Sequence, residues 1–322
     1  MKKALIIHNR ISENALQDEL DVLDQVGVVE KAFTDLGYET FRDDFDLNMQ
    51  RVKDSIQKID PHFIFNLVET VDGKGNLSFM APALFENMNI PFSGSGSFAM
   101  YVTSNKVLTK ESFINSGIPT GEWFSANELN KLNPAKRYIV KPLGEDGSVG
   151  ISEEGVFEGN DPKIKDFLKN NNPNEFFIEE YIHGREFNIS VIGGKNGGCV
   201  LPPAEIRFID FPEGKPHVLG YKSKWDEDSF EYKNTVRTFD FPESDKELLE
   251  KVKQISLNCW NKFNLKGYVR VDIRLDEKNN PYVLEINANP CISPDAGFYA
   301  ACKQAGLKFT DVISEIIHDA QR

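Results

Sequence analysis

Cysteine is scarce in this chain of 322 residues, which contains four. No two of them form a CxxC pair: they are Cys199, Cys259, Cys291 and Cys302. This spacing gives neither a disulfide framework nor a zinc site, and it is typical of a reducing compartment. We therefore expect a cytoplasmic protein.

An excess of basic residues is also absent, because the formal net charge is −13. Such a charge disfavours nucleic acid and anionic membrane surfaces as partners, since both would repel the chain. No apolar run approaches the length of a membrane span, and the run in MKKALIIHNR is too short for a signal peptide. We interpret that run as the first buried strand.

Motifs of several enzyme classes are missing from the sequence. The histidines share no ligand spacing, no GxSxG sequence marks a serine hydrolase, and no GxxxxGK[ST] sequence marks a Walker phosphate loop. Zinc chemistry and serine-hydrolase chemistry therefore have no support. Any anionic ligand has to be held by local lysines and arginines.

The first part of the chain, residues 1–103, alternates short apolar runs with amphipathic stretches. Apolar runs stand at ALII and HFIFNL, helical patterns at 17–36 and 47–59, and IPFSGSGS predicts a strand followed by a glycine turn. This is the rhythm of βαβ units and predicts a parallel sheet. A helix should then begin near Ser104, a candidate N-cap, and end at Gly117 before Pro119.

From residue 137 onward the sequence becomes rich in strands. They are expected at RYIVKP, EFFIEEYI, EFNISVIGG and GGCVLPPAEI, and helical patterns follow at 243–263 and 309–320. The chain is therefore a mixture of an α/β part and an α+β part.

The stretch YVRVDIRLDEKNNPYVLEINAN (268–289) predicts a β-hairpin with one chemical face. Centring its turn on Lys-Asn-Asn sets Asp272 opposite Glu285 and Arg270 opposite Asn287, because side chains alternate along a strand. The other pairs fill the apolar face: Val271 with Ile286, and Ile273 with Leu284.

Two directly opposed carboxylates repel each other unless a cation or a shared proton lies between them. Oxygen ligands from Asp272, Glu285 and Asn287, without histidine or thiolate, suit a hard ion such as Mg²⁺ that shares its shell with phosphates. The alternative is a solvated hairpin face on which acids and an arginine merely balance. The alignment of polar pairs against apolar pairs favours the metal site.

Other segments offer phosphate and nucleotide contacts, each with a plainer alternative. In IVKPLGEDGSVG, Lys141 precedes a glycine-rich loop carrying Ser148 whose backbone N–H groups could close over phosphates, although a simple hairpin turn is commoner. Lys106 could reach a phosphate or be a solvated helix residue. The pattern of EFFIEEYIHGREF fits a hinge whose backbone groups bind an adenine and whose Glu186 binds a ribose. The alternative is an ordinary strand edge.

Taken together, IVKPLGEDGSVG, EEYIHGREF, GYVRVDIRLD and VLEINANP resemble the ATP-grasp superfamily, and the best match is the D-alanine-D-alanine ligase family. The segment from FNLVETVDGKGNL to NSGIPT is similar to the same family, so the likeness covers nearly the whole chain. It implies an ATP-grasp fold with three parts: a pre-ATP-grasp domain at 1–103, a central subdomain with a glycine-rich flap at 104–186, and a C-terminal subdomain with the metal site at 187–322.

The resemblance also implies roles for individual residues. ATP would contact Lys106, Lys141, Glu179, Glu180, Ile182, Glu186 and Lys224. Mg²⁺, as two ions or with Mn²⁺ in its place, would bind Asp272, Glu285 and Asn287. Catalysis would use Arg270, Ser148 on the flap, Lys224 on a mobile loop, and the backbone N–H of Cys291, with Arg270 stabilising the oxyanion of the tetrahedral intermediate.

Departures from the family pattern concern the amino-acid substrates. In the family, a glycine-rich signature precedes the acid that binds the amine of the first substrate. That signature is missing from HNRISENALQDELDVLDQ, where either Glu19 or Asp18 is a candidate for the acid. In NANPCISPDAGF, Cys291 occupies the position where the family has a glycine, and Ala296 lies near the position of the family's carboxylate-binding serine. Asp295 is an acid that the family pattern lacks. An acid there repels a bare carboxylate and favours an amine or guanidine.

We therefore expect an ATP-dependent carboxylate-amine ligase that joins two amino acids through an acyl phosphate, with an acceptor other than D-alanine. The alternatives are an ATP-grasp kinase that phosphorylates a small molecule, and a non-catalytic ATP-binding regulatory protein. Homodimers are common in the resembled family, which makes a homodimer the expected state.

Overall fold

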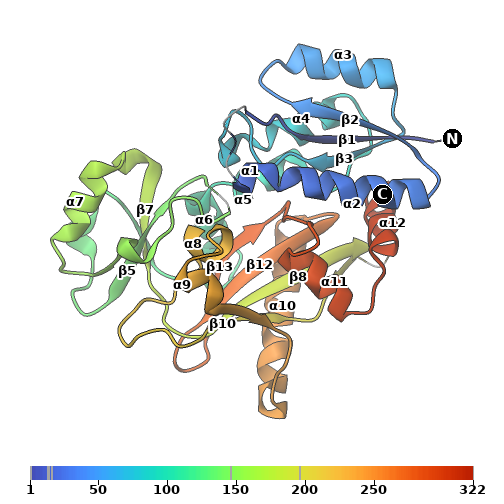
Figure 1. Cartoon of the computed structure of the whole chain (residues 1–322). Helices are drawn as coiled ribbons and strands as arrows, with labels where there is room; N and C mark the ends of the chain where they lie inside the picture. The colour runs from blue at the N-terminus through green and yellow to red at the C-terminus, as the bar shows by residue number, and fades with distance from the viewer. Residues whose placement is uncertain (1, 13–14, 16, 146, 196, 322) are drawn as a thin grey trace.

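Three sheets organise the computed structural model, which describes residues 2–12, 15, 17–145, 147–195 and 197–321. Figure 1 shows the N-terminal sheet above the largest sheet, with the third sheet to one side. Within the described residues, no helix is both long enough and apolar enough to cross a membrane. The mixed architecture confirms the expected fold class.

The N-terminal sheet is parallel, with strand order β2-β1-β3. Its strands are β1 (Lys3–Asn9), β2 (Glu39–Phe45) and β3 (Phe63–Leu67), and its main helices are α2 (Val22–Asp35), α3 (Met49–Ile59) and α4 (Met80–Asn87). Because successive residues of β1 point to opposite faces, Ala4 and Ile6 pack in one core with α2, while Leu5 and Ile7 pack in another with α3 and α4. The βαβ prediction is confirmed.

The central sheet is antiparallel and has the order β4-β7-β5-β6. Its elements are β4 (Trp123–Ser125), β5 (Arg137–Pro142), β6 (Val156–Glu158), β7 (Phe176–Glu180) and the covering helix α7 (Lys163–Asn170). Tyr138, Phe157 and Ile178 pack with Ile164 and Leu168 of the helix in a core of their own.

The C-terminal sheet has the order β11-β10-β8-β12-β13, with β9 also paired to β8. Its strands are β8 (Glu186–Gly194), β9 (Gly197–Val200), β10 (Ala204–Phe208), β11 (Thr235–Thr238), β12 (Tyr268–Leu275) and β13 (Pro281–Asn287). Val269, Val271 and Ile273 face a core shared with α10 (Lys246–Lys262). Arg270 and Asp272 therefore project from the opposite face.

The other α-helices of the described chain connect and cover these sheets. They are α1 (Gln17–Leu20), α5 (Ser97–Thr103), α6 (Lys106–Asn115), α8 (Tyr221–Trp225), α9 (Phe230–Lys233), α11 (Gly297–Gln304) and α12 (Phe309–Ala320).

Three local predictions were wrong. Ser104 ends α5 and is not the N-cap of the next helix, because Asn105 accepts a hydrogen bond from the backbone N–H of Leu108 at the start of α6. Residues 90–97 form no continuous strand, because Phe92 makes only an isolated bridge to Ile64. The hairpin register also shifts between Asp272 and Ile273, so that Val283 takes the place expected for Leu284.

Candidate active site

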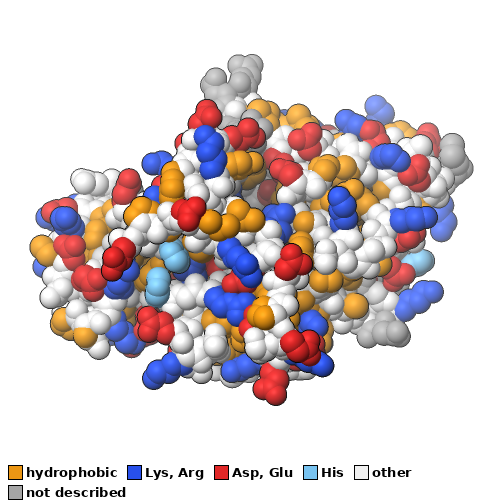
Figure 2. Space-filling model, turned by 60° about the horizontal axis from the view of Figure 1, so that its bottom comes forward, with side chains coloured by type: hydrophobic (Ala, Val, Ile, Leu, Met, Phe, Trp, Pro, Cys, Tyr) orange, Lys and Arg blue, Asp and Glu red, His pale blue; other side chains and the backbone are white. Residues whose placement is uncertain are grey.

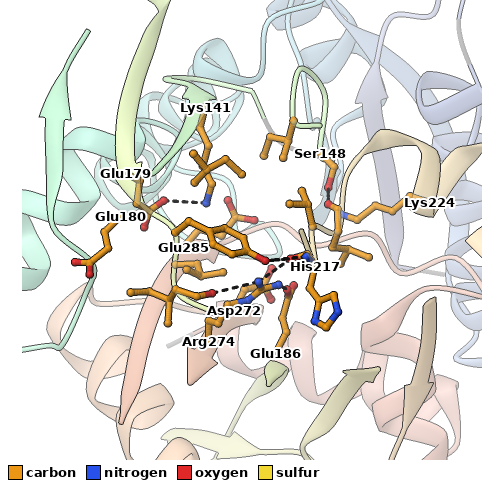
Figure 3. Close-up of a pocket in the computed structure, with 17 residues that line it drawn as sticks. Lys141, Ser148, Glu179, Glu180, Glu186, His217, Lys224, Asp272, Arg274 and Glu285 are labelled. Carbon is orange, nitrogen blue, oxygen red and sulfur yellow. Dashed lines mark hydrogen bonds and ion pairs between the residues drawn. The ribbon is translucent and has the colours of Figure 1, made fainter. Parts of the chain in front are cut away.

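A cleft between the central and C-terminal sheets, which we call the intersheet cleft, collects most of the predicted site residues. Strands β5 and β7 contribute from one side and strands β12 and β13 from the other. The predicted residues that line it are Lys141, Ser148, Glu179, Glu180, Ile182, Glu186, Lys224, Asp272 and Glu285 (Figure 3). Residues distant in sequence thus meet at one place.

Asp272 and Glu285 are cross-strand partners, as predicted, and Arg270 pairs with Asn287. Nε and Nη2 of Arg270 donate to the two carboxylate oxygens of Asp272, each at 2.8 Å. Nζ of Lys106 lies 3.5 Å from Oε2 of Glu285. The opposed acids are therefore each compensated by a cation of the protein itself.

The electrostatics of this cluster keep Glu285 ionised. Burial alone would raise the pKa of Glu285, but Lys106, Lys141, Arg270 and Lys224 outweigh it and lower the pKa to about 2. Burial raises the pKa of Asp272, against the opposing effect of Arg270. A carboxylate that stays charged among cations is suited to bind a divalent ion that arrives with a phosphate.

The donor set fits such an ion. Asp272 and Glu285 supply carboxylate oxygens at adjacent strand positions, and Asn287 follows on β13 with an amide oxygen that accepts from the backbone N–H of Asn289 at 3.1 Å. Within the described residues no group of three or more His, Cys, Asp or Glu gathers as a metal cluster. Two acids and an amide suit Mg²⁺, which takes few protein ligands.

Glu179 forms a buried ion-pair triad with two lysines. Its carboxylate lies 2.5 Å from Nζ of Lys110 and 2.8 Å from Nζ of Lys141, and Lys110 is 0% exposed. Burial alone would raise the pKa of Glu179, but the two lysines outweigh it and lower that pKa. Glu180 instead pairs with Lys136 at 3.0 Å. Lys141 thus reaches the cleft from an anchored position.

The cleft also combines an apolar lining with a second buried ion pair. Its apolar side chains are Ile139, Ile151, Ile182, Val218 and Leu284. Arg274 donates to Glu186 on the neighbouring strand and to the carbonyl of His217 at 2.7 Å. An apolar lining beside polar groups is suited to a planar heterocycle.

The glycine-rich loop after β5 contacts the loop that carries Lys224. Oγ of Ser148 donates to the carbonyl of Leu219 at 2.6 Å, and Nε1 of Trp225 donates to the carbonyl of Gly147 at 3.3 Å. Ser148 has a φ of 68°, a left-handed conformation that is uncommon outside glycine. These contacts hold the two loops together over the cleft and leave a space of about 70 Å³ beneath them.

Lys224 lies on α8, where it lines both the intersheet cleft and a second cavity. Burial lowers the pKa of Lys224, and the nearby charge of Arg270 lowers it further. Lys224 therefore stands at the junction between the predicted nucleotide site and the space beyond it.

The second cavity has a volume of about 430 Å³ and borders Arg270. The predicted residues that line it are Lys224, Arg270, Asn287, Cys291, Asp295 and Ala296. Three further charged residues, which are not among the sequence predictions, also line it: Asp21, Glu69 and Arg237. Acidic and basic groups thus share one cavity, as binding of a zwitterionic amino acid requires.

The N-terminal acid in this cavity is Asp21. Glu19 does not line the cavity, and the side chain of Asp18 lies outside the described part of the structure. Asp21 accepts from the thiol of Cys291 at 2.8 Å, and Gln25 donates to Asp21 at 3.3 Å and to Glu69 at 2.8 Å. Buried Gln25 therefore orients two carboxylates together.

Sequence signals existed for some of the missed residues. Arg274 follows Asp272 by two positions on the same strand, so the alternation that identified Asp272 also predicts Arg274 on that face. Glu69 comes just after β3, at the carboxyl end of a parallel strand, where ligands commonly bind. Asp21 stands among several acids in QDELDVLDQ, and no local pattern distinguishes it.

Comparisons with known proteins agree with this geometry. A family model described as "D-ala D-ala ligase C-terminus" matches residues 118–318. A D-alanine-D-alanine ligase of Rickettsia felis is 30% identical over 298 residues, covering 91% of this chain and 85% of that protein. One from Rickettsia typhi is 28% identical over 305 residues, covering 93% and 87%.

Solved structures show the same fold. The crystal structure of D-alanine-D-alanine ligase from Bacillus anthracis complexed with ATP superposes with a TM-score of 0.75 at 21% sequence identity. The superposition covers 100% of this chain and 98% of that one.

Proposed function

The chain belongs to the D-alanine-D-alanine ligase family, and from this premise we propose that it couples two amino acids and that its acceptor is not D-alanine. It is an ATP-dependent enzyme that forms C–N bonds and uses ATP and a divalent metal. The comparisons give no support to a small-molecule kinase or to a non-catalytic ATP-binding protein.

The observation that carries the proposal is that the intersheet cleft and the second cavity adjoin at Leu219 and Lys224, which line both, and that Arg270 lines the second cavity beside them. ATP supplies the phosphoryl group that activates the donor carboxylate, and the divalent ion neutralises its charge. Asp272, Glu285 and Asn287 would hold that ion. Lys106, Lys141 and Lys224 would bind phosphate oxygens.

Arg270 stands where the acyl group is transferred. Its guanidinium and the backbone N–H of Cys291 would stabilise the oxyanion that forms when the acceptor amine attacks the acyl phosphate, an effect of about 3 kcal/mol for such a donor. The bidentate contact with Asp272 fixes the orientation of the guanidinium. Closure of the Ser148 and Trp225 loops would exclude water from the acyl phosphate.

Several acids surround the second cavity and support an acceptor with an additional cationic group. Asp295 accepts a hydrogen bond from Oγ of Ser293 at 2.9 Å. Burial raises the pKa of the nearby Asp21, and the negative charge of Asp295 raises it further. The adjoining hollow toward α8 is lined by further acids: Asp24, Asp226, Glu227 and Asp228. An amine or guanidine entering there would be attracted, whereas a small neutral side chain would gain nothing.

The metal ions, the oligomeric state and the location follow the sequence predictions. We propose two Mg²⁺ ions, with Mn²⁺ as a substitute, a homodimeric assembly, and a cytoplasmic location. Basic and acidic side chains intermingle on the face shown in Figure 2, without a continuous basic tract there. This distribution agrees with small-molecule substrates rather than nucleic acid.

Product analysis tests the proposal directly. The protein is incubated with ATP, Mg²⁺ and pooled D- and L-amino acids, and products are identified by mass spectrometry alongside ADP release. We expect an amide of two amino acids in which the acceptor is basic. A stable phosphorylated compound without any amide would contradict the ligase, and fastest turnover with D-alanine alone would contradict the proposed acceptor.

Arg270→Lys adds a test of the catalytic assignment. The substitution keeps a positive charge near Asp272 but removes the planar pair of donors, so amide formation should fall about a hundredfold. Binding of ATP with Mg²⁺, measured by calorimetry, should persist. Unchanged turnover in this variant would count against the oxyanion role.

A further inference from the structure

Arg237 is a cation of the second cavity that neither the sequence patterns nor the family resemblance singled out. It lies on β11, at the edge of the C-terminal sheet, and lines the cavity together with Asp295 and Gly297. Its Nη1 donates to the backbone carbonyl of Asp295 at 3.2 Å. A Cβ placed on Gly297 would lie 3.7 Å from Nη2, so the guanidinium stands directly beside that residue.

Arg237 differs from the other cations of the site in its partners. Arg270 is paired with Asp272, Arg274 with Glu186, Lys141 with Glu179, and Lys106 with Glu285. Within the described residues, no carboxylate forms an ion pair with Arg237. Four of the five N–H donors of an arginine therefore remain for a ligand after the single bond to a carbonyl.

The surroundings of Arg237 favour an anion in the cavity. Burial lowers the pKa of Arg237, and the like charge of Arg270 lowers it further, against a smaller effect of Asp295. Two guanidinium groups in one cavity repel each other unless a negative group lies near them. Arg270 is already compensated by Asp272, whereas Asp295, which attracts Arg237, forms no ion pair with it in the described structure.

An amino-acid acceptor carries such a group. The neighbouring Ala296 offers no hydroxyl to a carboxylate, whereas a guanidinium binds a carboxylate through two parallel hydrogen bonds. The carboxylate of Asp295 accepts from Oγ of Ser293, and the hydrogen bond of Arg237 goes to the backbone carbonyl of Asp295. The acid therefore remains available for a cationic side chain of the same acceptor.

We propose that Arg237 binds the α-carboxylate of the acceptor amino acid and makes the enzyme selective for acceptors that carry one. This inference rests on the proposed function, because it assumes that an acyl phosphate is formed from the donor. In the coupling step the acceptor nitrogen forms a bond to the acyl carbon and loses a proton. The C–O bond to phosphate breaks, and phosphate leaves with the electron pair.

Hydroxylamine separates the two half-reactions, because it attacks an acyl phosphate without needing a carboxylate. With ATP, Mg²⁺ and a donor amino acid, hydroxamate formation reports donor activation alone. The acceptor probes are the D- and L-amino acids of the pooled assay, each paired with its carboxamide, which keeps the attacking amine but lacks the carboxylate.

For Arg237→Gln we expect the KM for the acceptor amino acid to rise about tenfold to a hundredfold, the range for loss of hydrogen bonds to a charged group. The carboxamide should be used as in the wild type, so that the preference for the acid disappears, and hydroxamate formation should continue. Arg237→Lys should restore part of the preference. Arg207→Gln, on the adjacent strand and outside the second cavity, is the matched control.

Two results would overturn the inference: an unchanged preference for the acid in Arg237→Gln, or a parallel loss of hydroxamate and amide, which would indicate a defect in donor activation or folding. Absence of hydroxamate from the wild-type protein with every amino acid has a different meaning. It would defeat the proposed ligase function itself, and this inference with it.

Discussion

A single buried lysine, Lys110, connects the fold to the nucleotide cleft at the scale of one residue. Its ammonium pairs with Glu179 and donates to Oγ1 of Thr120 at 2.8 Å, and that hydroxyl donates to the carbonyl of Val283 on β13. Burial lowers the pKa of Lys110, although Glu179 opposes this effect. The residue therefore positions Glu179, which in turn anchors Lys141.

Replacement of Lys110 with methionine should destabilise the protein strongly. The change leaves the buried carboxylate of Glu179 with one lysine instead of two, and breaking a buried ion pair lowers the free energy of unfolding by about 3–5 kcal/mol. Urea unfolding measures this difference. The KM for ATP should also rise, because Glu179 then holds Lys141 more tightly.

The exposed pair of Lys131 and Glu128 provides the control for this prediction. Lys131→Met should lower the free energy of unfolding by less than about 1 kcal/mol. The double variant Lys110→Met with Glu179→Gln should regain part of the lost stability. Equal stability of Lys110→Met and the wild type would contradict the role given to the buried triad.

The two lysines of α6 show what the sequence could not resolve at this scale. Lys106 and Lys110 are four residues apart and therefore lie on the same face of the helix. Of these two lysines the sequence predicts a phosphate contact for Lys106, yet Lys110 is the one fully removed from solvent. A lysine on a helix is normally solvated, so only the tertiary packing against β7 and β13 reveals its role.

At the scale of elements, two loops close over the cleft and hold each other. The glycine-rich loop carries Ser148 and Gly147, and α8 carries Lys224 and Trp225. Among the described residues, the link between them includes the hydroxyl and indole hydrogen bonds and one from the backbone N–H of Tyr221 to the carbonyl of Ile151 at 3.3 Å. Loops held in this way can open to release products.

Trp225→Phe should loosen this closure without removing the aromatic ring. Loss of one hydrogen bond shifts the balance toward the open state by about 1 kcal/mol. Water would then reach the acyl phosphate more often, and ADP should be released in excess over amide product. The ratio of the two, measured by coupled assay and mass spectrometry, checks this expectation.

Trp123→Phe, on β4 and outside the intersheet cleft, serves as the control. It should keep the wild-type ratio of ADP to amide. If Trp225→Phe also keeps that ratio, the indole hydrogen bond does not control access of water.

The hairpin of β12 and β13 shows how far alternation alone predicts an element. Asp272 faces Glu285 and Arg270 faces Asn287 as expected. Beyond them a bulge adds one residue to β13, so Leu284 joins Glu285 on the cleft side while Val283 and Ile286 are buried. A bulge leaves no mark in a pattern of period two, which is why the apolar wall formed by Leu284 was missed.

At the scale of the whole molecule, the N-terminal sheet and the C-terminal part share one hydrophobic core. Phe65 of β3 stacks on Tyr268 of β12 with ring centroids 6.0 Å apart, and Phe298 of α11 packs against the same tyrosine. The central sheet has a separate core around Tyr138 and Phe157. The division at residues 103 and 186 stays a prediction, but the cores group the first and last segments together.

The shared core could not be anticipated from the sequence, because each apolar run looks alike until its partner is known. Ile6 and Val312 are separated by most of the chain and belong to the same cluster. Periodicity predicts which face of an element is buried, and it does not predict which element covers it.

Hydrogen exchange should therefore detect two cooperative units rather than three. In the absence of ligands, amides of β1 and β12 should open with the same free energy, while those of β5 and β7 open with a different one. Phe65→Ala should lower the opening free energy of β1 and β12 together by about 3–5 kcal/mol, and Phe157→Ala should act on β5 and β7. Exchange followed by mass spectrometry at increasing urea resolves the segments. If Phe65→Ala released β1 while β12 kept its protection, the two sheets would be independent domains. Binding of an amino acid by Asp21 and Glu69 could then not be coupled to the hairpin through this core.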